Sequence, residues 1–365
     1  MFLERPSAPT RIHHFESSPT AAVSVDRGML FAERQAKFRG HAVAFEHVDG
    51  FTVGAAGGNG AGVVVDDDDD ALDDEARRAV AAALGFSETV FVARAPPAGC
   101  DVAMRYFTPV GEVDLCGHAT VAALGHLRAR GRLGDGGGVL RARAGDVKFA
   151  FEPPGGDASG AAALRVFMEQ LAPTIDAPLG AASAASPADV ARALGGDGVE
   201  LASAWPPRVA STGLRDLLVA VRSPLGEMRP DFAAVARLSE ALGTVGVHAF
   251  ELGDAARDGS AGAPIRVRNF APLYDIDEES ATGTSNCALA CALRASGALA
   301  LPGEGGGELH FAQGEGMGAP SRIVARPPVA PGSRPWVGGQ FCWRCAGRVE
   351  LDVDDAGATR GRRVD

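Results

Sequence analysis

The sequence has few cysteines and few aromatic residues, and it contains no long hydrophobic run. Six cysteines spread unevenly over 365 residues are too few for a disulfide scaffold, so a reducing compartment is favoured. No apolar stretch approaches the length of a membrane span. Aromatic residues make up 6% of the chain, whereas glycine and alanine are abundant, which predicts cores of small side chains. We therefore expect a cytoplasmic protein without a membrane partner.

Basic residues are also scarce relative to acidic ones. The chain has 35 Lys and Arg against 46 Asp and Glu, a net charge of −11. Because nucleic-acid binding needs a positive surface, no nucleic-acid partner is expected. A small anionic ligand is still compatible with this charge, because backbone dipoles bind one locally. The first residues lack the apolar segment of a secretory signal, and residues 1–40 are predicted to form a loosely ordered leader.

Regular patterning begins near residue 41 and divides the chain into two parts. Its length suggests two or three domains. The segment 153–163, "PPGGDASGAAA", is typical of a linker. The predicted boundaries are a first α/β half at 41–155, completed by strands from 335–352; a second α/β half at 160–330; and a tail at 353–365.

Much of one phrase occurs twice. The segment "RYFTPVGEVDLCGHATVAALGHLRARG" (105–131) and the segment "RNFAPLYDIDEESATGTSNCALACALRASG" (268–297) share R-x-F-x-P, a helix-opening glycine, L-R-A and a closing glycine. Both predicted helices are apolar on nearly every side, as a helix surrounded by sheet must be. The repeat predicts an α+β fold of two similar halves related by a pseudo-twofold axis. In each half a twisted, mostly antiparallel sheet is wrapped around a central helix.

The two predicted helix starts are suited to bind an anion. The first N–H groups of a helix have no partner within it, and glycine lets a ligand approach closely. If Gly117-His118 and Gly283-Thr284 face each other across a cleft, they form a dry pocket that fits a small carboxylate. His118 is expected to be neutral, because the positive end of the helix dipole disfavours the imidazolium.

Two glutamates are expected beside this pocket. Glu88 begins a predicted strand, and Glu279 lies four residues before Gly283. Partial burial of a carboxyl raises its pKa toward the range that is useful for proton transfer. Asn59, in the turn "GGNG", is a further candidate for lining the pocket.

Several blocks together resemble a known family. In order, "FEHVDGFT", "SETVFV", "MRYFTPVGEVDLCGHAT" and "EESATGTSN" are similar to conserved segments of the PhzF-like proteins of phenazine biosynthesis. The likeness runs from about residue 41 to 352. It implies the diaminopimelate-epimerase-like fold, a homodimer, and cofactor-free isomerisation of a small carboxylate-bearing substrate. In the archetype that substrate is trans-2,3-dihydro-3-hydroxyanthranilate.

The resemblance also implies roles for individual residues. The family glutamate that moves a proton between carbons falls on Glu88, and the family histidine falls on His118. A family aspartate falls on Glu279, so this chain departs from the pattern by one methylene group and the archetypal substrate is not carried over. The helix-start donors fall on Gly117, His118, Gly283 and Thr284.

Three alternatives are open. A racemase or epimerase of the same fold uses two thiols; Cys116 stands where one is needed, but the position of its mate is Thr282. A protein of this fold without turnover, acting by binding alone, is the second. The third is a metalloprotein built on Cys342 and Cys345, but a lone C-x-x-C with no partner nearby favours a structural role. No metal site is predicted.

Overall fold

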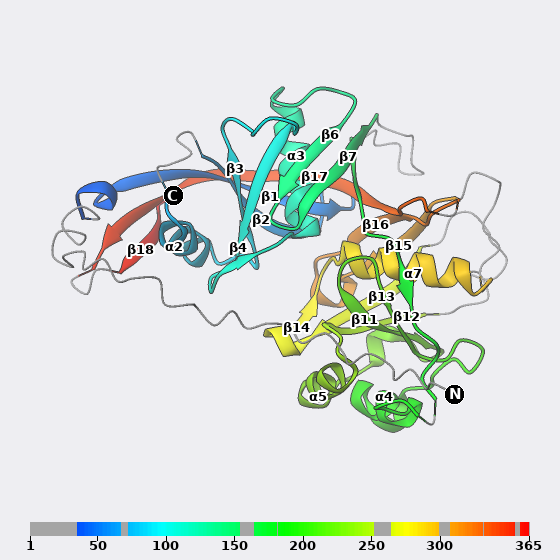
Figure 1. Cartoon of the computed structure of the whole chain (residues 1–365). Coiled ribbons are helices and arrows are strands. Elements are labelled where there is room, and N and C mark those ends of the chain that lie inside the picture. The colour runs from blue at the N-terminus through cyan, green and yellow to red at the C-terminus, as the bar shows by residue number, and fades with distance from the viewer. Residues whose placement is uncertain are drawn as a thin grey trace, which may run out of the picture.

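The structure is a computed structural model that describes residues 35–66, 72–153, 164–180, 182–251, 264–298, 307–330, 332–354 and 358–364. Most of the predicted leader and of the predicted linker therefore lie outside the described residues. Within them, strands form two groups, each placed around one central helix (Figure 1). This is the mixed α+β architecture expected from the repeated phrase.

The first group of strands encloses α3. The strands pair in the order β1–β2–β3–β4–β6–β7–β8, and β17 pairs with both β8 and β1. The sheet therefore closes around the helix. Its elements are β1 (His41–Thr52), β2 (Asn59–Asp66), α2 (Asp74–Leu84), β3 (Thr89–Ala93), β4 (Val102–Phe107), β5 (Glu112–Val113), α3 (Gly117–Ala129), β6 (Gly138–Ala142), β7 (Gly145–Glu152) and β8 (Arg165–Glu169).

The second group repeats these pairings around α7. The parallel pairs β2–β3 and β4–β6 correspond to β11–β12 and β13–β15, and the intervening pairs are antiparallel in both groups. The prediction of two similar halves is thus confirmed. The elements are β9 (Thr174–Ile175), α4 (Pro187–Leu194), β10 (Arg208–Ser211), β11 (Arg215–Val221), α5 (Phe232–Leu242), β12 (Gly246–Glu251), β13 (Ile265–Ala271), β14 (Ile276–Glu279), α7 (Gly283–Ala295), β15 (Leu309–Gln313) and β16 (Ser321–Arg326).

One long strand, β17 (Trp336–Val353), belongs to both groups. Its first residues pair with β8 and β16, and residues 340–351 pair with β1. The predicted tail also contains a strand, β18 (Thr359–Val364), which pairs with β17 and lies against α2 (Figure 1). The arginine-rich sequence shows no apolar pattern that would predict this strand. The strand lies at an outer edge, and Arg360 and Arg362 point toward solvent.

The outer helices and the central helices begin differently. Asp73, Ser186 and Asp231 cap α2, α4 and α5 by accepting from a backbone N–H. By contrast, Cys116 and Thr282 precede α3 and α7 without a side-chain cap. Both central helices are buried almost throughout and share one apolar core. Uncapped starts in a buried setting leave backbone donors available at the point where the two halves meet.

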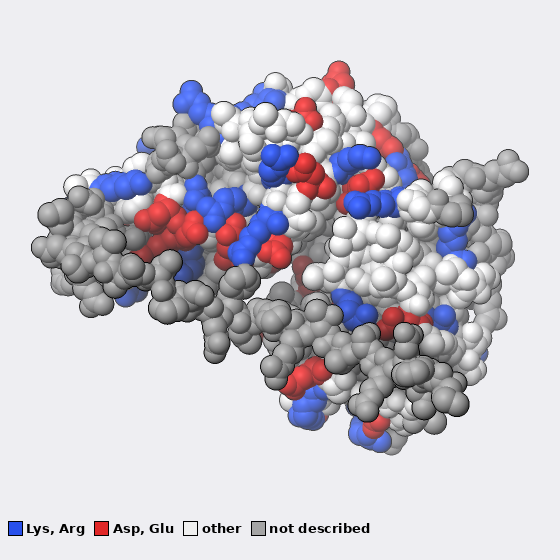
Figure 2. Space-filling model, viewed as in Figure 1, with Lys and Arg blue, Asp and Glu red and all other residues white. Residues whose placement is uncertain are grey.

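One face of the molecule carries charges of both signs. On the face shown in Figure 2, Lys and Arg alternate with Asp and Glu, and neither sign gathers into a broad patch. None of the helices in the described part of the chain is long and apolar enough to cross a bilayer.

Candidate active site

An irregularity in β1 brings the two helix starts together. The ladder between β1 and β17 shifts register at Gly50–Thr52, and Phe51 adopts a left-handed backbone with φ of 62°. A Cβ on Gly50 would lie 2.3 Å from the carbonyl oxygen of His118, and one on Gly283 would lie 2.9 Å from the Phe51 ring. Residues 50–51 are therefore wedged against the first turns of both helices, which requires glycine at each contact.

His118 lies between two carboxyl groups. Its Nε2 is 3.5 Å from Glu88 Oε2, and its Nδ1 is 3.8 Å from Glu279 Oε1. Glu88 comes from the entry to β3 and Glu279 from the end of β14, so each half supplies one acid. The three predicted catalytic residues are thus brought together at the start of α3.

Asn59, at the start of β2, bridges the second carboxyl and the imidazole. Its Nδ2 lies 3.2 Å from His118 Nδ1 and donates to Glu279 Oε1 over 3.2 Å. With Asn59 donating to Nδ1, the proton of the neutral ring is on Nε2, the nitrogen that faces Glu88. Asn59 therefore sets the tautomer as well as lining the site.

Burial decides the charge states here. Burial lowers the pKa of His118, against the opposing effect of Glu88, so the ring is neutral near pH 7. Burial, and next the charge of Glu88, raise the pKa of Glu279 to about 8. At neutral pH Glu279 therefore carries a proton for most of the time. A buried carboxyl that keeps its proton near neutral pH is suited to act as an acid.

Glu88 has an unsatisfied acceptor. Its Oε2 is shielded from solvent and has no hydrogen-bond partner in the described part of the chain, beyond the long approach of His118. A buried carboxylate oxygen without a donor is costly, and such exceptions point to function. This oxygen is the candidate acceptor for a substrate proton.

At the start of α7, the side chain of Thr284 is already hydrogen-bonded within the protein. The hydroxyl of Thr284 donates to Gln170 Oε1 over 3.1 Å, and the Thr284 carbonyl accepts from Thr212. Any ligand contact at Gly283-Thr284 would consequently be made by backbone N–H groups, as the sequence analysis expected of Gly117 too.

Three side chains near α3 offer metal-ligand atoms, but their directions do not converge. Glu88, Cys116 and His118 place one donor each within 4.8 Å of one another. The Cys116 sulfur, however, is 3.4 Å from Nδ1 and 3.9 Å from Nε2 of His118, so it lies beside the ring and along neither nitrogen lone pair. Burial also raises the pKa of the Cys116 thiol. These distances favour a packed, neutral thiol.

Four supporting residues were missed by sequence reasoning. The Thr282 hydroxyl donates to Glu279 Oε2 over 2.8 Å and accepts from Gln313, while the Thr282 carbonyl accepts from Asn286. Arg344 donates to the carbonyls of Ala55 and Gly57, and these hydrogen bonds hold the turn before Asn59. Arg344 lies between Cys342 and Cys345 of the C-x-x-C, and both of these cysteines are free thiols. The motif drew attention to its cysteines, although the arginine between them supports the site.

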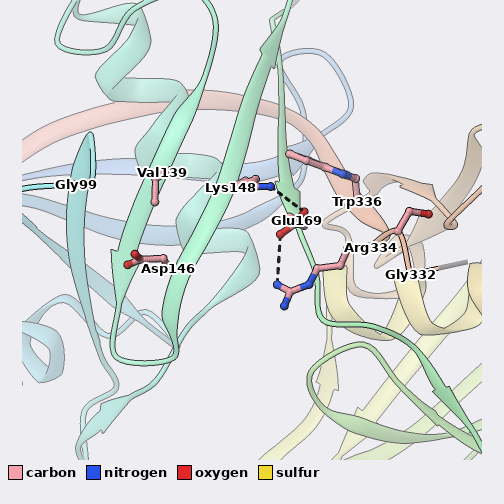
Figure 3. A pocket seen from close by; sticks show the side chains of 9 residues that line it. Gly99, Val139, Asp146, Lys148, Glu169, Gly332, Arg334 and Trp336 are labelled. Atoms are coloured by element: carbon pink, nitrogen blue, oxygen red, sulfur yellow. Dashed lines mark hydrogen bonds and ion pairs between the residues drawn. The ribbon is translucent and has the colours of Figure 1, made fainter. Parts of the chain in front are cut away.

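A hollow of about 680 Å³ lies elsewhere, between the β6–β7 hairpin and the start of β17. Figure 3 shows Lys148 and Arg334 reaching the same carboxylate, Glu169, at 3.9 and 3.4 Å. Because Lys148 and Arg334 are both paired with Glu169, the hollow does not present the convergent donors of the His118 region.

Comparisons with known proteins identify the family. A family model described as "Phenazine biosynthesis-like protein" (PhzC-PhzF) matches residues 48–331. The chain belongs to this family. It is 34% identical over 259 residues to an uncharacterized isomerase of Deinococcus radiodurans, covering 68% of this chain and 76% of that one. It is 30% identical over 252 residues to the trans-2,3-dihydro-3-hydroxyanthranilate isomerase of Pseudomonas aeruginosa, covering 68% and 77%.

Solved structures of PhzF relatives have the same fold. The PhzF-family phenazine biosynthesis protein of Bacillus anthracis aligns with a TM-score of 0.71 and 25% identity, over 85% of this chain and 99% of that chain. A hydroxyproline epimerase from Agrobacterium vitis shares the fold at 15% identity, with a TM-score of 0.50 and coverage of 87% and 94%. This PhzF-like chain is accordingly an isomerase with the diaminopimelate-epimerase-like fold.

Proposed function

We propose that this PhzF-like isomerase moves a proton between two carbon atoms of a small carboxylate-bearing metabolite, with Glu88 as the proton carrier. The observation that carries the proposal is the approach of Glu88 and Glu279 to opposite nitrogens of one buried histidine, at 3.5 and 3.8 Å. Two acids and a neutral imidazole at a pair of helix starts form a site for general acid–base chemistry.

The proton transfer balances without a cofactor. The Glu88 carboxylate takes a proton from a carbon next to a double bond, and the C–H electron pair moves into the conjugated system. The same proton then returns to another carbon of that system, so the substrate is isomerised with no net oxidation. Glu279 in its acid form and the neutral His118 donate hydrogen bonds to the charge that develops on the substrate.

The helix starts are proposed to bind the substrate carboxylate. Backbone N–H groups at Gly117-His118 and Gly283-Thr284 point out of uncapped helices, and the dipoles of both helices favour an anion there. The family relationship supports a biosynthetic role, a homodimer in the cytoplasm and, as one candidate substrate, trans-2,3-dihydro-3-hydroxyanthranilate. The extra methylene of Glu279 makes a related substrate of different shape an equal candidate.

The thiol alternative is disfavoured by the contacts of Thr282. A two-thiol racemase needs an acid–base group before Gly283, but the Thr282 hydroxyl donates to Glu279 and accepts from Gln313. A hydroxyl held in this way has no role as a carbon acid's base at neutral pH. The carboxyl pair is thus the better candidate.

Solvent exchange tests the proposal. The purified protein is incubated in D₂O with trans-2,3-dihydro-3-hydroxyanthranilate and with a panel of small cyclic and amino carboxylates. We expect deuterium in a carbon position of at least one compound, and roughly a 10²–10⁴-fold slower exchange for Glu88→Gln with binding retained. The matched control is Glu350→Gln, which removes a surface glutamate paired with Arg362. If Glu88→Gln exchanges as fast as the wild type, Glu88 does not carry the proton.

A further inference from the structure

Gln313 lies behind Glu279, at the end of β15. It is about 1% exposed. Its Nε2 donates to the Glu279 carbonyl over 2.7 Å and to the Thr282 hydroxyl over 2.9 Å, while its Oε1 accepts from Thr282 N over 3.2 Å. One buried amide therefore contacts both ends of the 279–282 turn.

The orientation of this amide is fixed by backbone groups. A carbonyl oxygen only accepts and a backbone N–H only donates, so Nε2 must face the Glu279 carbonyl and Oε1 must face Thr282 N. The Thr282 hydroxyl consequently accepts from Gln313. Its single proton then points to Glu279 Oε2, 2.8 Å away.

We infer that Gln313 is a positioning residue, which directs the Thr282 proton onto Glu279 Oε2 and so leaves Oε1 as the oxygen that carries the exchangeable proton. Oε1 is the oxygen that faces Asn59 and His118. The acid form of Glu279 is thereby oriented toward the reacting region. The inference deepens the proposed function and rests on it for the catalytic consequence only.

A buried chain of hydrogen bonds holds Gln313 from behind. Asn286 Nδ2 donates to the Thr282 carbonyl and to Gln313 Oε1, both over 2.9 Å. Asn286 Oδ1 must then accept from His248 Nε2, 3.2 Å away, and His248 Nδ1 accepts from Asn269. Burial lowers the pKa of His248 to about 4, so this ring is neutral with its proton on Nε2. Every donor in the chain points toward Glu279.

The test reads the carboxyl directly in the ligand-free protein. Glutamate side chains are labelled with ¹³C at the carboxyl carbon, and Glu279 is assigned as the NMR signal missing from Glu279→Gln. Thr282→Val removes the donor, and we expect the titration midpoint of Glu279 to rise by about one pH unit, with Thr282→Ser restoring it. Gln313→Met should raise the midpoint by less, because the Thr282 hydroxyl then rotates freely. Gln313→Glu should raise it by more, because a carboxylate at that place attracts the Thr282 proton and adds negative charge.

A buried threonine elsewhere in the second half is the matched control. The Thr244 hydroxyl donates to the Ser239 carbonyl, away from Glu279, so Thr244→Val should leave the midpoint unchanged. If Thr282→Val shifts the midpoint but neither Gln313 variant does, Gln313 does not set the proton direction and the inference is wrong. If Thr282→Val leaves the midpoint unchanged, the hydrogen bond from Thr282 to Glu279 does not affect the carboxyl, and the inference is also wrong. Should Gln313→Met fail to fold, the isosteric Gln313→Glu decides.

Turnover separates this inference from the proposed function. On trans-2,3-dihydro-3-hydroxyanthranilate as the probe, Gln313→Met should lower kcat about tenfold with little change in KM and shift the alkaline limb of the pH profile upward. If the wild type moves no proton on any compound while the midpoint shifts are observed, the proposed function fails and the positioning of Glu279 stands.

Discussion

The starts of α3 and α7 occupy equivalent places in the two halves, but different side chains lie beneath them. Under α3, Tyr106 donates to Thr120 over 2.7 Å, Thr120 donates to the Cys116 carbonyl, and the surroundings are apolar. Under α7, the corresponding positions are Asn269 and Asn286. Each of these asparagines contacts His248.

A buried acid adds to this difference. Asp216, on β11, accepts from the Ser285 hydroxyl over 2.5 Å, and burial raises its pKa to about 6. Beneath α3 the first half therefore has apolar packing and one short hydrogen-bond path, whereas beneath α7 the second half has a polar network that reaches Glu279. We conclude that duplication supplied two anion-binding helix starts, and that polar substitution beneath the second adapted it to control a carboxyl.

Glu279→Gln tests the comparison most severely. Glutamine keeps a neutral, hydrogen-bonding side chain but has no proton to release, so we expect kcat/KM to fall by roughly 10²–10⁴-fold. In the wild type, kcat/KM should fall as the pH rises through about 8, because the acid form of Glu279 is lost. That limb should be absent from the residual activity of the variant. A pH profile with an unchanged limb would assign it to another group.

Glu279→Gln, which should lower activity, should raise the stability of the folded protein at alkaline pH. The folded pKa of Glu279 is raised to about 8, above the value of about 4.3 for an unfolded glutamate. Between these values the folded protein binds a proton that the unfolded chain has released, so this group's contribution to stability declines as pH rises through the window. Glu279→Gln removes that decline, and we expect a gain of about 1–3 kcal/mol at pH 8 but little at pH 4. Urea unfolding at both pH values measures the difference.

The paired variants Asn286→Leu and Thr120→Val compare the buried hydrogen bonds beneath α7 and α3. Leucine at 286 leaves the buried His248 N–H without its partner and removes one of the two donors to the Gln313 carbonyl, at a cost of about 3 kcal/mol. Valine at 120 removes one acceptor from Tyr106, at a cost of about 1 kcal/mol. Equal losses in urea unfolding would show that the network beneath α7 is no more important than the single bond beneath α3.

Arg326 joins the two halves through charge. It pairs with Glu152 at the end of β7, where Nη1 and Oε1 are 2.5 Å apart, and with Glu308 before β15, and it stacks 3.8 Å over Phe167. Arg326→Met should cost about 1–2 kcal/mol, because partial exposure screens the pairs. Burial of Glu308 is outweighed by hydrogen bonds from His310 and the arginines, which lower its pKa. The loss should therefore be present at pH 7 and shrink as the carboxyls are protonated in acid.

How far the sequence alone leads depends on the kind of signal. The phrases at 105–131 and 268–297 predicted the two halves and the helix starts, because glycine and apolar periodicity are local features. The blocks of the family resemblance pointed to Glu88, His118 and Glu279, and the structure places one carboxyl oxygen of each glutamate 3.5 or 3.8 Å from a ring nitrogen of His118. Gln313 and Arg344 could not be predicted, because their contacts join segments that are 31 and 287 residues apart. Strand β18 was missed because an exposed edge strand needs no apolar face.

Substitution of Cys116 gives the smallest expected effect. It tests how the two helix starts have come to differ. Cys116 precedes α3 as Thr282 precedes α7, so the two positions are related by the duplication. Its thiol is buried, its pKa is raised by burial, and its sulfur lies beside the His118 ring at 3.4 Å. A packing role predicts that Cys116→Ser lowers kcat/KM by less than about threefold and leaves solvent exchange intact, since a hydroxyl is close in size. A loss comparable with that of Glu88→Gln would instead make the thiol a proton carrier, and the asymmetry between the halves would then be that of a one-thiol enzyme.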